Sequence, residues 1–352
     1  MLKKSGKPNQ QLIADRLNLS RTTVSRCFTH HPKINPETRA AVFQLAKELG
    51  YDYSQPRNVE GTNSELAERI EVLIGIPEDR KDMAPSAQKV FEGISEKAAA
   101  EKLQVDLHYV DPSQYAPSAR ARKLLPDVRF RDVKGVVLIY AFDEQTVQNL
   151  MGRLPVVSVF EDYDSTNVDC INPDQIRGIS YMIEHLVGLG HREIGFLSWK
   201  YHVPAPWAER RLGAFVENLY RFNIPFEPKN VINMRRDEQV EPEQMVDMVA
   251  QRVEAGVRAW VCAADHQAYY LMTELEKRGI RVPQDVSITG FDGEKPPKGC
   301  KQMTTFEVPF RSMGISSVLS IQRRFAHPTD PRRQVLVDGV FKLGETTAIP
   351  RK

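Results

Sequence analysis

The stretch SRTTVSRCF, residues 20–28, has the pattern of a short helix with one polar, cationic side. Ser20 is a suitable N-cap, because its hydroxyl can accept a hydrogen bond from a backbone N–H of the first turn. Val24 and Phe28 are spaced i, i+4, so the pattern predicts that both face inward. The outward side then carries Arg21, Thr22, Ser25 and Arg26. The free N–H groups and positive dipole end of such a helix favour an anionic partner.

Two further helices flank this one in the predicted head. The first spans about residues 10–17, and Asn9 is its candidate cap. The third runs from about residue 36 to residue 49 and opens with Asn35 and Pro36, a cap followed by proline at the first helical position. Two short helices joined by a tight turn, with a third helix to hold them, form the helix-turn-helix layout.

The exposed side chains of residues 20–28 predict contacts with duplex DNA. Arginine can donate two hydrogen bonds to guanine in the major groove, and threonine can contact a thymine methyl group or a phosphate. Thr23 and Ser25 are better suited to phosphate or sugar, which are contacts that position a helix without reading sequence.

The charge of the chain is distributed unevenly between its two ends. The net charge is +2, but the first 60 residues hold ten Lys/Arg and five Asp/Glu, whereas the rest holds 38 and 41. A small basic head on a mildly acidic body predicts a polyanionic partner for the head alone. The alternative interpretation is a solvated basic tail without a partner.

Cysteine usage and hydropathy indicate the compartment. Four cysteines lie far apart and form no CxxC pair, which favours reduced thiols in a reducing compartment. No run approaches 18 apolar residues, and no apolar stretch follows the basic N-terminus MLKKSGKPNQ. We therefore expect a cytoplasmic, nucleoid-associated protein without a membrane span or secretory signal.

The head resembles that of the lactose- and galactose-repressor family of transcriptional regulators, through the segment LIADRLNLSRTTVSRCFTHHPKINPETRAAVFQLAKELGY, residues 12–51. The resemblance implies base-reading roles for Arg21, Thr22 and Arg26, with further DNA contacts at Lys33 and Thr38. One recognition helix reads only a half-site, so we expect a homodimer on a near-palindromic double-stranded DNA operator. The full predicted DNA-binding set is Asn9, Ser20, Arg21, Thr22, Thr23, Ser25, Arg26, Thr29, Lys33, Asn35 and Thr38.

The hinge that would follow the head departs from the family pattern. In the family this segment folds as a short helix and wedges a leucine into the minor groove. Here Glu60 stands at the wedge position, where a carboxylate is electrostatically unfavourable, and Arg57 replaces a small residue. Either the usual kink is absent, or Val59 acts as the wedge in a shifted register. The predicted hinge contacts are Pro56, Arg57 and Val59.

From residue 69 onward, short β-branched runs such as IEVLIGI (70–76) and GVVLIY (135–140) alternate with helical periods. This alternation predicts parallel sheets with right-handed crossovers, and two successive series predict two lobes with a cleft between them. The resemblance extends here through EHLVGLGHREIGFL (184–197) and RGIRVPQDVSITGFDG (278–293). It implies an effector domain similar to periplasmic sugar-binding proteins.

The predicted fold is therefore a small all-α helix-turn-helix head and an α/β, doubly wound, two-lobed periplasmic-binding-protein-like body with parallel sheets. We expect the head at 1–53, the hinge at 54–68 and an effector-binding, dimerising body at 69–352. The first lobe would comprise about 69–170 and 307–336, and the second about 171–306 and 337–352.

The resemblance implies a ligand site built on Arg211 and Asp292, with Asp265 beside them. A guanidinium fork and carboxylates from different elements supply the donors and acceptors that a polyhydroxylated ligand needs. Each residue also has an ordinary alternative: Arg211 could form a surface salt bridge, and Asp265 could cap the helix that follows it.

Two departures from the family pattern concern the ligand. Ala264 stands where the family often has asparagine, and Phe160 where it often has aspartate, although Glu161 could supply the acid instead. Phe160 and Trp207 could stack on a sugar face, or they could simply pack. The predicted effector-binding set is Arg211, Asp265, Asp292, Phe160 and Trp207.

Other classes of function find less support in the sequence. It has no GxSxG, P-loop or HExxH motif, and its histidines lack the spacing of a metal site, so we expect no enzyme, cofactor or metal. His191, after Gly190, is expected to add a favourable charge at a helix C-terminus.

The leading hypothesis is a repressor that releases DNA when a sugar-like inducer binds. The opposite effect, in which the ligand is a co-repressor that strengthens DNA binding, stays open. The alternatives are a sugar-binding transport protein, a sugar-processing enzyme and a regulator that answers a purine-like ligand.

Overall fold

The computed structural model describes residues 9–28, 34–49, 51, 68–112, 133–163, 166–199, 205–232 and 240–351. The chain divides into two compact units, Met1–Ile171 with Phe310–Val335, and Asn172–Pro309 with Leu336–Lys352. It therefore passes between the units three times. Some predicted contacts lie outside the described residues: Thr29, Lys33, Pro56, Arg57 and Val59.

The head consists of three helices: α1 (Gln10–Arg16), α2 (Arg21–Phe28) and α3 (Pro36–Glu48). The predicted bounds of α2 are confirmed, and those of α1 and α3 are correct to within one residue. Asn18, with φ 53°, turns the chain between α1 and α2, a conformation that asparagine tolerates. The core that the helices share consists of Ile13, Ala14, Val24, Cys27, Val42 and Ala46.

The first unit contains a six-stranded sheet in the order β11-β5-β4-β3-β1-β2. Its strands are β1 (Arg69–Ile74), β2 (Gln104–Tyr109), β3 (Val133–Ile139), β4 (Val156–Val159), β5 (Asp169–Pro173) and β11 (Gln334–Val337). Pairing is parallel from β2 through β5, and Val72 lies opposite both Leu107 and Val137. The helical segments are η1 (Glu78–Met83), α4 (Pro85–Ala100), α6 (Glu144–Met151) and α11 (Phe310–Ala326).

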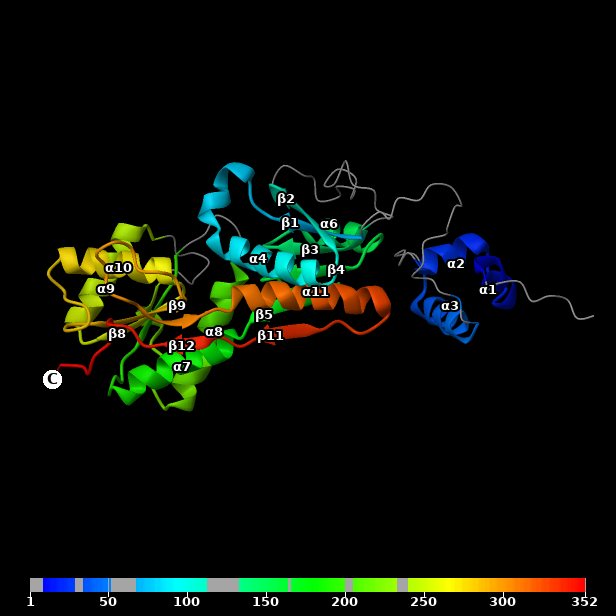
Figure 1. Ribbon diagram of the computed structural model, residues 1–352. Coiled ribbons are helices and arrows are strands. Elements are labelled where there is room, and N and C mark those ends of the chain that lie inside the picture. The colour runs from blue at the N-terminus through cyan, green and yellow to red at the C-terminus, as the bar shows by residue number, and fades with distance from the viewer. Residues whose placement is uncertain are drawn as a thin grey trace, which may run out of the picture. The chain divides into compact units, whose positions relative to one another are not determined.

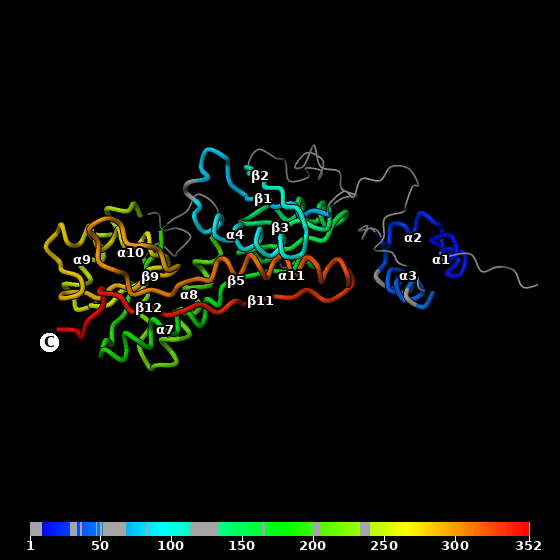
Figure 2. Tube along the Cα trace, viewed as in Figure 1, coloured from blue at the N-terminus to red at the C-terminus, as the bar shows by residue number. Residues whose placement is uncertain are grey.

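Helices α4 and α11 lie side by side although they come from opposite ends of the body (Figures 1 and 2). Glycines allow this close packing. A Cβ atom on Gly93 would lie 1.9 Å from the carbonyl oxygen of Arg311, and one on Gly314 would lie 2.1 Å from that of Val90. Any larger residue at either position would force the two backbones apart.

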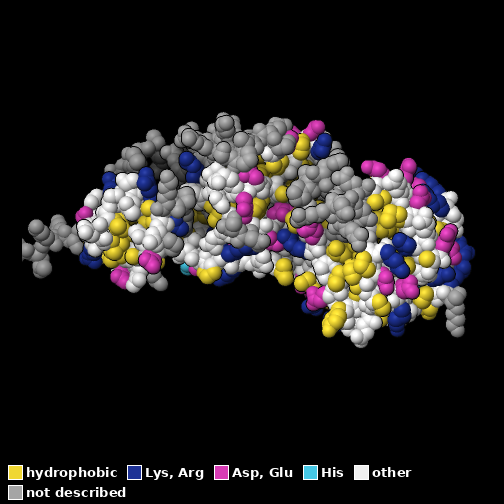
Figure 3. All heavy atoms as spheres, turned by 180° about the vertical axis from the view of Figure 1, so that it is seen from behind, with side chains coloured by type: hydrophobic (Ala, Val, Ile, Leu, Met, Phe, Trp, Pro, Cys, Tyr) yellow, Lys and Arg dark blue, Asp and Glu magenta, His cyan; other side chains and the backbone are white. Residues whose placement is uncertain are grey.

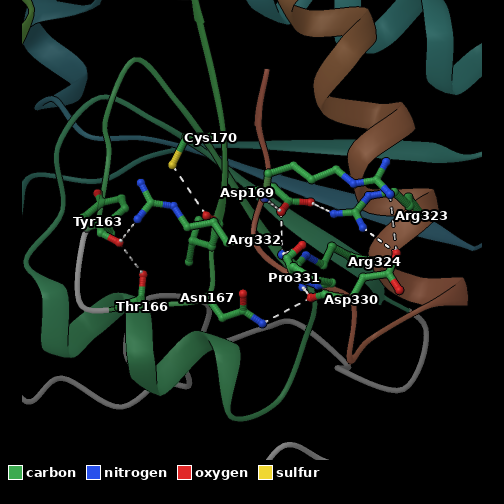
Figure 4. A network of polar contacts seen from close by, with 12 residues as sticks. Tyr163, Thr166, Asn167, Asp169, Cys170, Arg323, Arg324, Asp330, Pro331 and Arg332 are labelled. Atoms are coloured by element: carbon green, nitrogen blue, oxygen red, sulfur yellow. Dashed lines mark hydrogen bonds and ion pairs between the residues drawn. The ribbon is translucent and has the colours of Figure 1, made fainter. Parts of the chain in front are cut away.

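Asp169, at the start of β5, ties the end of α11 and the segment before β11 to the sheet (Figure 4). Its fully buried carboxylate accepts hydrogen bonds from Arg323, from Arg324 Nη2 at 2.5 Å and from the Arg333 N–H at 2.8 Å. A buried charge needs such partners, so this one group holds three segments that are far apart in sequence.

The second unit contains a sheet in the order β12-β10-β9-β8-β6-β7, parallel except where β12 pairs with β10. Its strands are β6 (Gly195–Leu197), β7 (Val231–Ile232), β8 (Ala259–Cys262), β9 (Ser287–Asp292), β10 (Thr304–Glu307) and β12 (Val340–Lys342). Its helical segments are α7 (Gln175–Gly188), α8 (Pro206–Arg221), η4 (Pro228–Asn230), α9 (Pro242–Glu254) and α10 (Asp265–Lys277). A large core cluster around Trp260 packs α9 and α10 on this sheet.

The end of α7 differs from the prediction in one respect. Gly190 has φ 100°, and the His191 N–H donates to the carbonyl oxygen of Leu186 at 3.1 Å, which ends the helix as expected. The His191 ring is buried, however, with Nε2 2.9 Å from the carbonyl oxygen of Ala348, and burial lowers its pKa. The expected favourable charge on His191 is therefore wrong.

The two sheets and the helical head confirm the predicted fold class. No helix among the described residues is long and apolar enough to cross a membrane. Lys/Arg and Asp/Glu side chains intermingle with exposed hydrophobic ones on the face shown in Figure 3.

Candidate functional site

The outward side of α2 is the first candidate site. Arg21, Thr22 and Arg26 are exposed, whereas Val24 and Cys27 on the opposite side are fully buried. Phe28 packs edge-on against Phe43, with ring centroids 5.2 Å apart. The burial of one side thus forces the cationic side into solvent, where it can meet a nucleic acid.

Several predicted DNA contacts also cap the helices of the head. The Asn9 side chain accepts from the Leu12 N–H at 2.9 Å, and Ser20 Oγ accepts from the Thr23 N–H at 3.0 Å. Asn35 Oδ1 accepts from the Glu37 N–H at 2.8 Å. These three residues therefore fix where α1, α2 and α3 begin. Contacts with DNA at Ser20, Thr23, Ser25 and Thr38, which are partly or fully exposed, remain predictions.

A second candidate site lies in the second unit around Arg211 on α8. Its side chain is only 6% exposed, and its Nη2 lies 3.1 Å from Asp292 Oδ1. Its Nε donates to Gln175 Oε1 at 2.9 Å, and its Nη1 donates to the carbonyl oxygen of Ala263. The alternative of a surface salt bridge is therefore wrong, because the guanidinium is buried, its partner Asp292 is half-buried, and three groups hold the guanidinium in place.

Aromatic rings complete the surroundings of this guanidinium. Its carbon lies 3.7 Å from the ring centroid of Phe291 and 4.7 Å from that of Trp207. Stacking on ring faces adds attraction and holds the plane of the group. The predicted residues Arg211, Asp292 and Trp207 are thus brought together.

Asp265 occupies a different position from the one that a helix cap would have. Helix α10 begins at Asp265 itself, and Ala264 is its N-cap residue, so the capping alternative is wrong. The Asp265 carboxylate is fully buried and accepts from Thr305 Oγ1 and from the Glu294 N–H, both at 2.7 Å. Burial first, and then the charge of Asp292, raises the pKa of Asp265 to about 7. In this structure Asp265 orients the loop after β9 and presents no surface to a ligand.

Phe160 belongs to the first unit, whereas the other predicted effector residues belong to the second. It has φ 79° and stacks on Tyr140, with ring centroids 5.5 Å apart, and meets Phe310 edge-on at 6.0 Å. These contacts show the packing role that the sequence left open, and a ligand contact at Phe160 remains a prediction.

The structure also adds residues that the sequence did not single out. His266 follows Asp265 on α10, and its ring meets that of Trp199 edge-on at 4.9 Å. Burial and the charge of Arg211 lower the pKa of His266 to about 4, which keeps the imidazole neutral near pH 7. Single ligand atoms of His266, Asp292 and Glu294 all lie within 4.8 Å of one another.

Two family models match the chain. The model described as bacterial regulatory proteins, lacI family, matches residues 11–54, which contain the three helices of the head. The model described as periplasmic binding protein-like domain matches residues 183–347.

Relatives match over nearly their whole lengths. The transcriptional repressor MelR of Bacillus subtilis is 24% identical over 344 residues, covering 92% of this chain and 93% of that protein. The transcriptional repressor CytR of Escherichia coli K12 is 24% identical over 350 residues, covering 96% of both chains.

Solved structures share the fold. The regulator CelR in complex with cellobiose superposes with a TM-score of 0.64 at 20% identity, over 96% of this chain and 99% of that one. A lac repressor dimer bound to operator and the anti-inducer ONPF gives a TM-score of 0.63 at 20% identity, over 97% of this chain and 100% of that one. A regulator from Enterococcus faecium with bound ribose gives 0.61 at 20% identity, over 81% and 100%.

Proposed function

We propose, because the chain belongs to the lacI family of bacterial regulatory proteins, that it is a sequence-specific DNA-binding repressor controlled by a small-molecule effector. The observation that carries the proposal is that α2 is buried on one side and exposed on the other. Val24 is fully buried, whereas Arg21 and Arg26 are exposed on a helix whose first turn Ser20 caps. Such a helix can enter the major groove with its cationic side toward the bases.

The roles of the exposed side chains follow from their chemistry. Arg21 and Arg26 can each donate a bidentate pair of hydrogen bonds to guanine, and Thr22 can contact a thymine methyl group. Ser20, Thr23 and Ser25 are suited to phosphate. One head reads one half-site, so we propose that a homodimer binds a near-palindromic operator.

Binding of the full chain to duplex DNA at increasing salt tests this proposal. A duplex selected from a random pool should bind far more tightly than random competitor, and log K should fall linearly with log salt, by about 0.9 for each phosphate contacted. A protein with no preference for any duplex at low ionic strength, with or without candidate metabolites, would not be such a repressor.

For the effector, we propose a sugar or sugar derivative held by Arg211, Asp292 and Trp207. The ion pair of buried Arg211 and half-buried Asp292 supplies directed donors and acceptors, and the indole supplies an apolar face. The complexes of structural relatives with cellobiose and ribose support this class of ligand. A thermal-shift screen of sugars and purines tests it, since a bound ligand raises the unfolding temperature. Stabilisation by purines alone would favour the other ligand class.

The remaining parts of the proposal concern what the protein is not and where it acts. The named relatives are transcriptional regulators, which supports a regulator and not an enzyme. A DNA partner supports a cytoplasmic, nucleoid-associated location. Hinge contacts at Pro56, Arg57 and Val59 belong to the same proposal, and the substitution of each by alanine would test them.

A further inference from the structure

Three side chains with metal-binding atoms converge in the second unit. His266 lies in the first turn of α10, Asp292 ends β9, and Glu294 lies in the loop that follows. One ligand atom of each lies within 4.8 Å of the others, and all three side chains are half-buried. We propose that His266, Asp292 and Glu294 form a binding site for a divalent transition-metal ion such as Zn²⁺.

The donor set decides the class of ion. One imidazole with two carboxylates suits zinc and its neighbours in the first transition row, whereas Mg²⁺ prefers oxygen ligands alone. Nitrogen and oxygen atoms bound at about 2.0–2.2 Å to one tetrahedral zinc ion lie about 3.3–3.6 Å apart. The observed limit of 4.8 Å is wider by about 1 Å, so the three side chains would rotate inward to close around the ion.

The surroundings hold two of the three donors in place. The Asp265 carboxylate accepts from the Glu294 N–H at 2.7 Å, which fixes the loop that carries the Glu294 side chain. Trp199 packs edge-on against the His266 ring at 4.9 Å. A Cβ atom on Gly290 would lie 2.0 Å from Asp265 Oδ1, so the glycine makes room for the residue that positions the loop. Metal sites bind more tightly when such outer contacts orient their ligands.

The charge balance also permits a cation, although Arg211 is close. Arg211 Nη2 lies 3.1 Å from Asp292 Oδ1. A carboxylate has two oxygens and several lone pairs, so it can pair with a guanidinium and bind an ion at once. Even with Asp265 uncharged, the carboxylates of Asp292 and Glu294 outnumber the one guanidinium. The bound ion would share Asp292 with Arg211, and so would alter the proposed effector site.

Metal binding by the full chain tests this site directly and needs no DNA or effector. The purified protein is stripped with chelator and titrated with Zn²⁺ and Co²⁺ by calorimetry and, for Co²⁺, by visible absorption. We expect a Zn²⁺ site that His266→Ala and Glu294→Gln each weaken tenfold or more, since even outer contacts change affinity about 10–100-fold. His327→Ala, which removes an exposed histidine of the first unit, should leave it unchanged.

Glu294→Gln keeps the shape of the side chain, and circular dichroism of both variants checks that they fold. Loss of the same site in both variants, with retention in His327→Ala, supports the proposal. Absence of Zn²⁺ binding by the unaltered chain, or binding that neither variant weakens, overturns it. The experiment measures metal binding alone. Its result therefore neither supports nor contradicts the proposed binding of DNA, which is tested separately.

Discussion

Asp169 is a single residue on which the packing of the first unit depends. It is fully buried, and Arg324, one of its partners, is only 5% exposed. Removal of one member of a buried ion pair leaves an uncompensated charge, which costs about 3–5 kcal/mol. Asp169→Asn should therefore lower the free energy of unfolding by about that amount in urea denaturation. Asp106→Asn, which breaks a pair with Arg69 that solvent still reaches at 31% and 44% side-chain exposure, should cost about 1 kcal/mol.

The same residue gives a prediction about pH. Burial would raise the pKa of Asp169, but hydrogen bonds from Arg324, the Arg333 N–H and Arg323 outweigh it, so the pKa is lowered. A carboxyl group with a lowered folded pKa stabilises the protein above its unfolded pKa of about 3.9 and loses this effect as pH falls through the folded value. The stability difference between the unaltered chain and Asp169→Asn should thus shrink below about pH 4. A difference that stays constant down to pH 2 would contradict this assignment.

Substitution of Arg26 tests the proposed contact of α2 with a base pair. It is exposed on α2, and one bidentate contact with a base is worth about 1–3 kcal/mol of discrimination. Arg26→Ala should weaken binding to the selected duplex by that amount and relax preference at one base pair, measured by fluorescence anisotropy. Arg221→Ala, an exposed arginine of the second unit, is the matched control and should bind as the unaltered chain does.

Side chains of the second unit show which residues of the candidate site can be predicted from the sequence and which cannot. Arg211 and Asp292 could be predicted because each matches a family position, and the structure pairs them. His266 and Glu294 could not, because they meet only through the fold of β9 and α10. Asp265 can be buried only because Gly290, on a neighbouring strand, has no side chain. The residues next to Asp265 in the sequence do not reveal this.

At the scale of elements, strong periodicity was the reliable signal. The continuous apolar runs of β1 and β3 and the amphipathic α2 were predicted nearly residue by residue. The pattern missed β5 and α11, and it did not delimit β10, β11 and β12. Strand β11 is short and at most half-buried, so it lacks a clear alternation of polar and apolar residues. Helix α11 buries two serines, a glycine and Arg324 among apolar residues such as Met313, Val318 and Ile321, so its apolar stripe is interrupted in the sequence.

The contact of α4 with α11 provides a test at this scale. Gly314→Ala would place a Cβ atom 2.1 Å from the Val90 carbonyl oxygen, and such overpacking costs about 1–3 kcal/mol. Hydrogen exchange should quicken in α4 and α11 but not in α8. Gly213→Ala on α8, where the added methyl group would meet no described atom beyond its own stretch of helix within 4 Å, should instead stabilise its helix by about 1 kcal/mol. Equal effects of both substitutions would rule out the close helix contact.

For the whole molecule, the proposed function requires the effector and the operator to influence each other's affinity. Allosteric coupling is typically 1–3 kcal/mol, or about 5–150-fold, and is reciprocal by thermodynamic necessity. An inducer that weakens operator binding by some factor must therefore bind the operator-loaded protein more weakly by the same factor. Anisotropy with labelled operator and calorimetry with the effector measure the two factors independently.

The substitution Trp207→Ala tests the proposed effector site separately from the DNA-binding site. Trp207 contacts Arg211 in the second unit and is far along the chain from α2, so its loss should leave operator affinity without effector unchanged. The variant should bind the effector about 5–150-fold more weakly, since a buried aromatic contact is worth roughly 1–3 kcal/mol with its area. Operator release should then need correspondingly more effector while the maximal release stays the same. A variant that responds at unchanged effector concentrations would place the effector elsewhere, even if the head binds DNA as proposed.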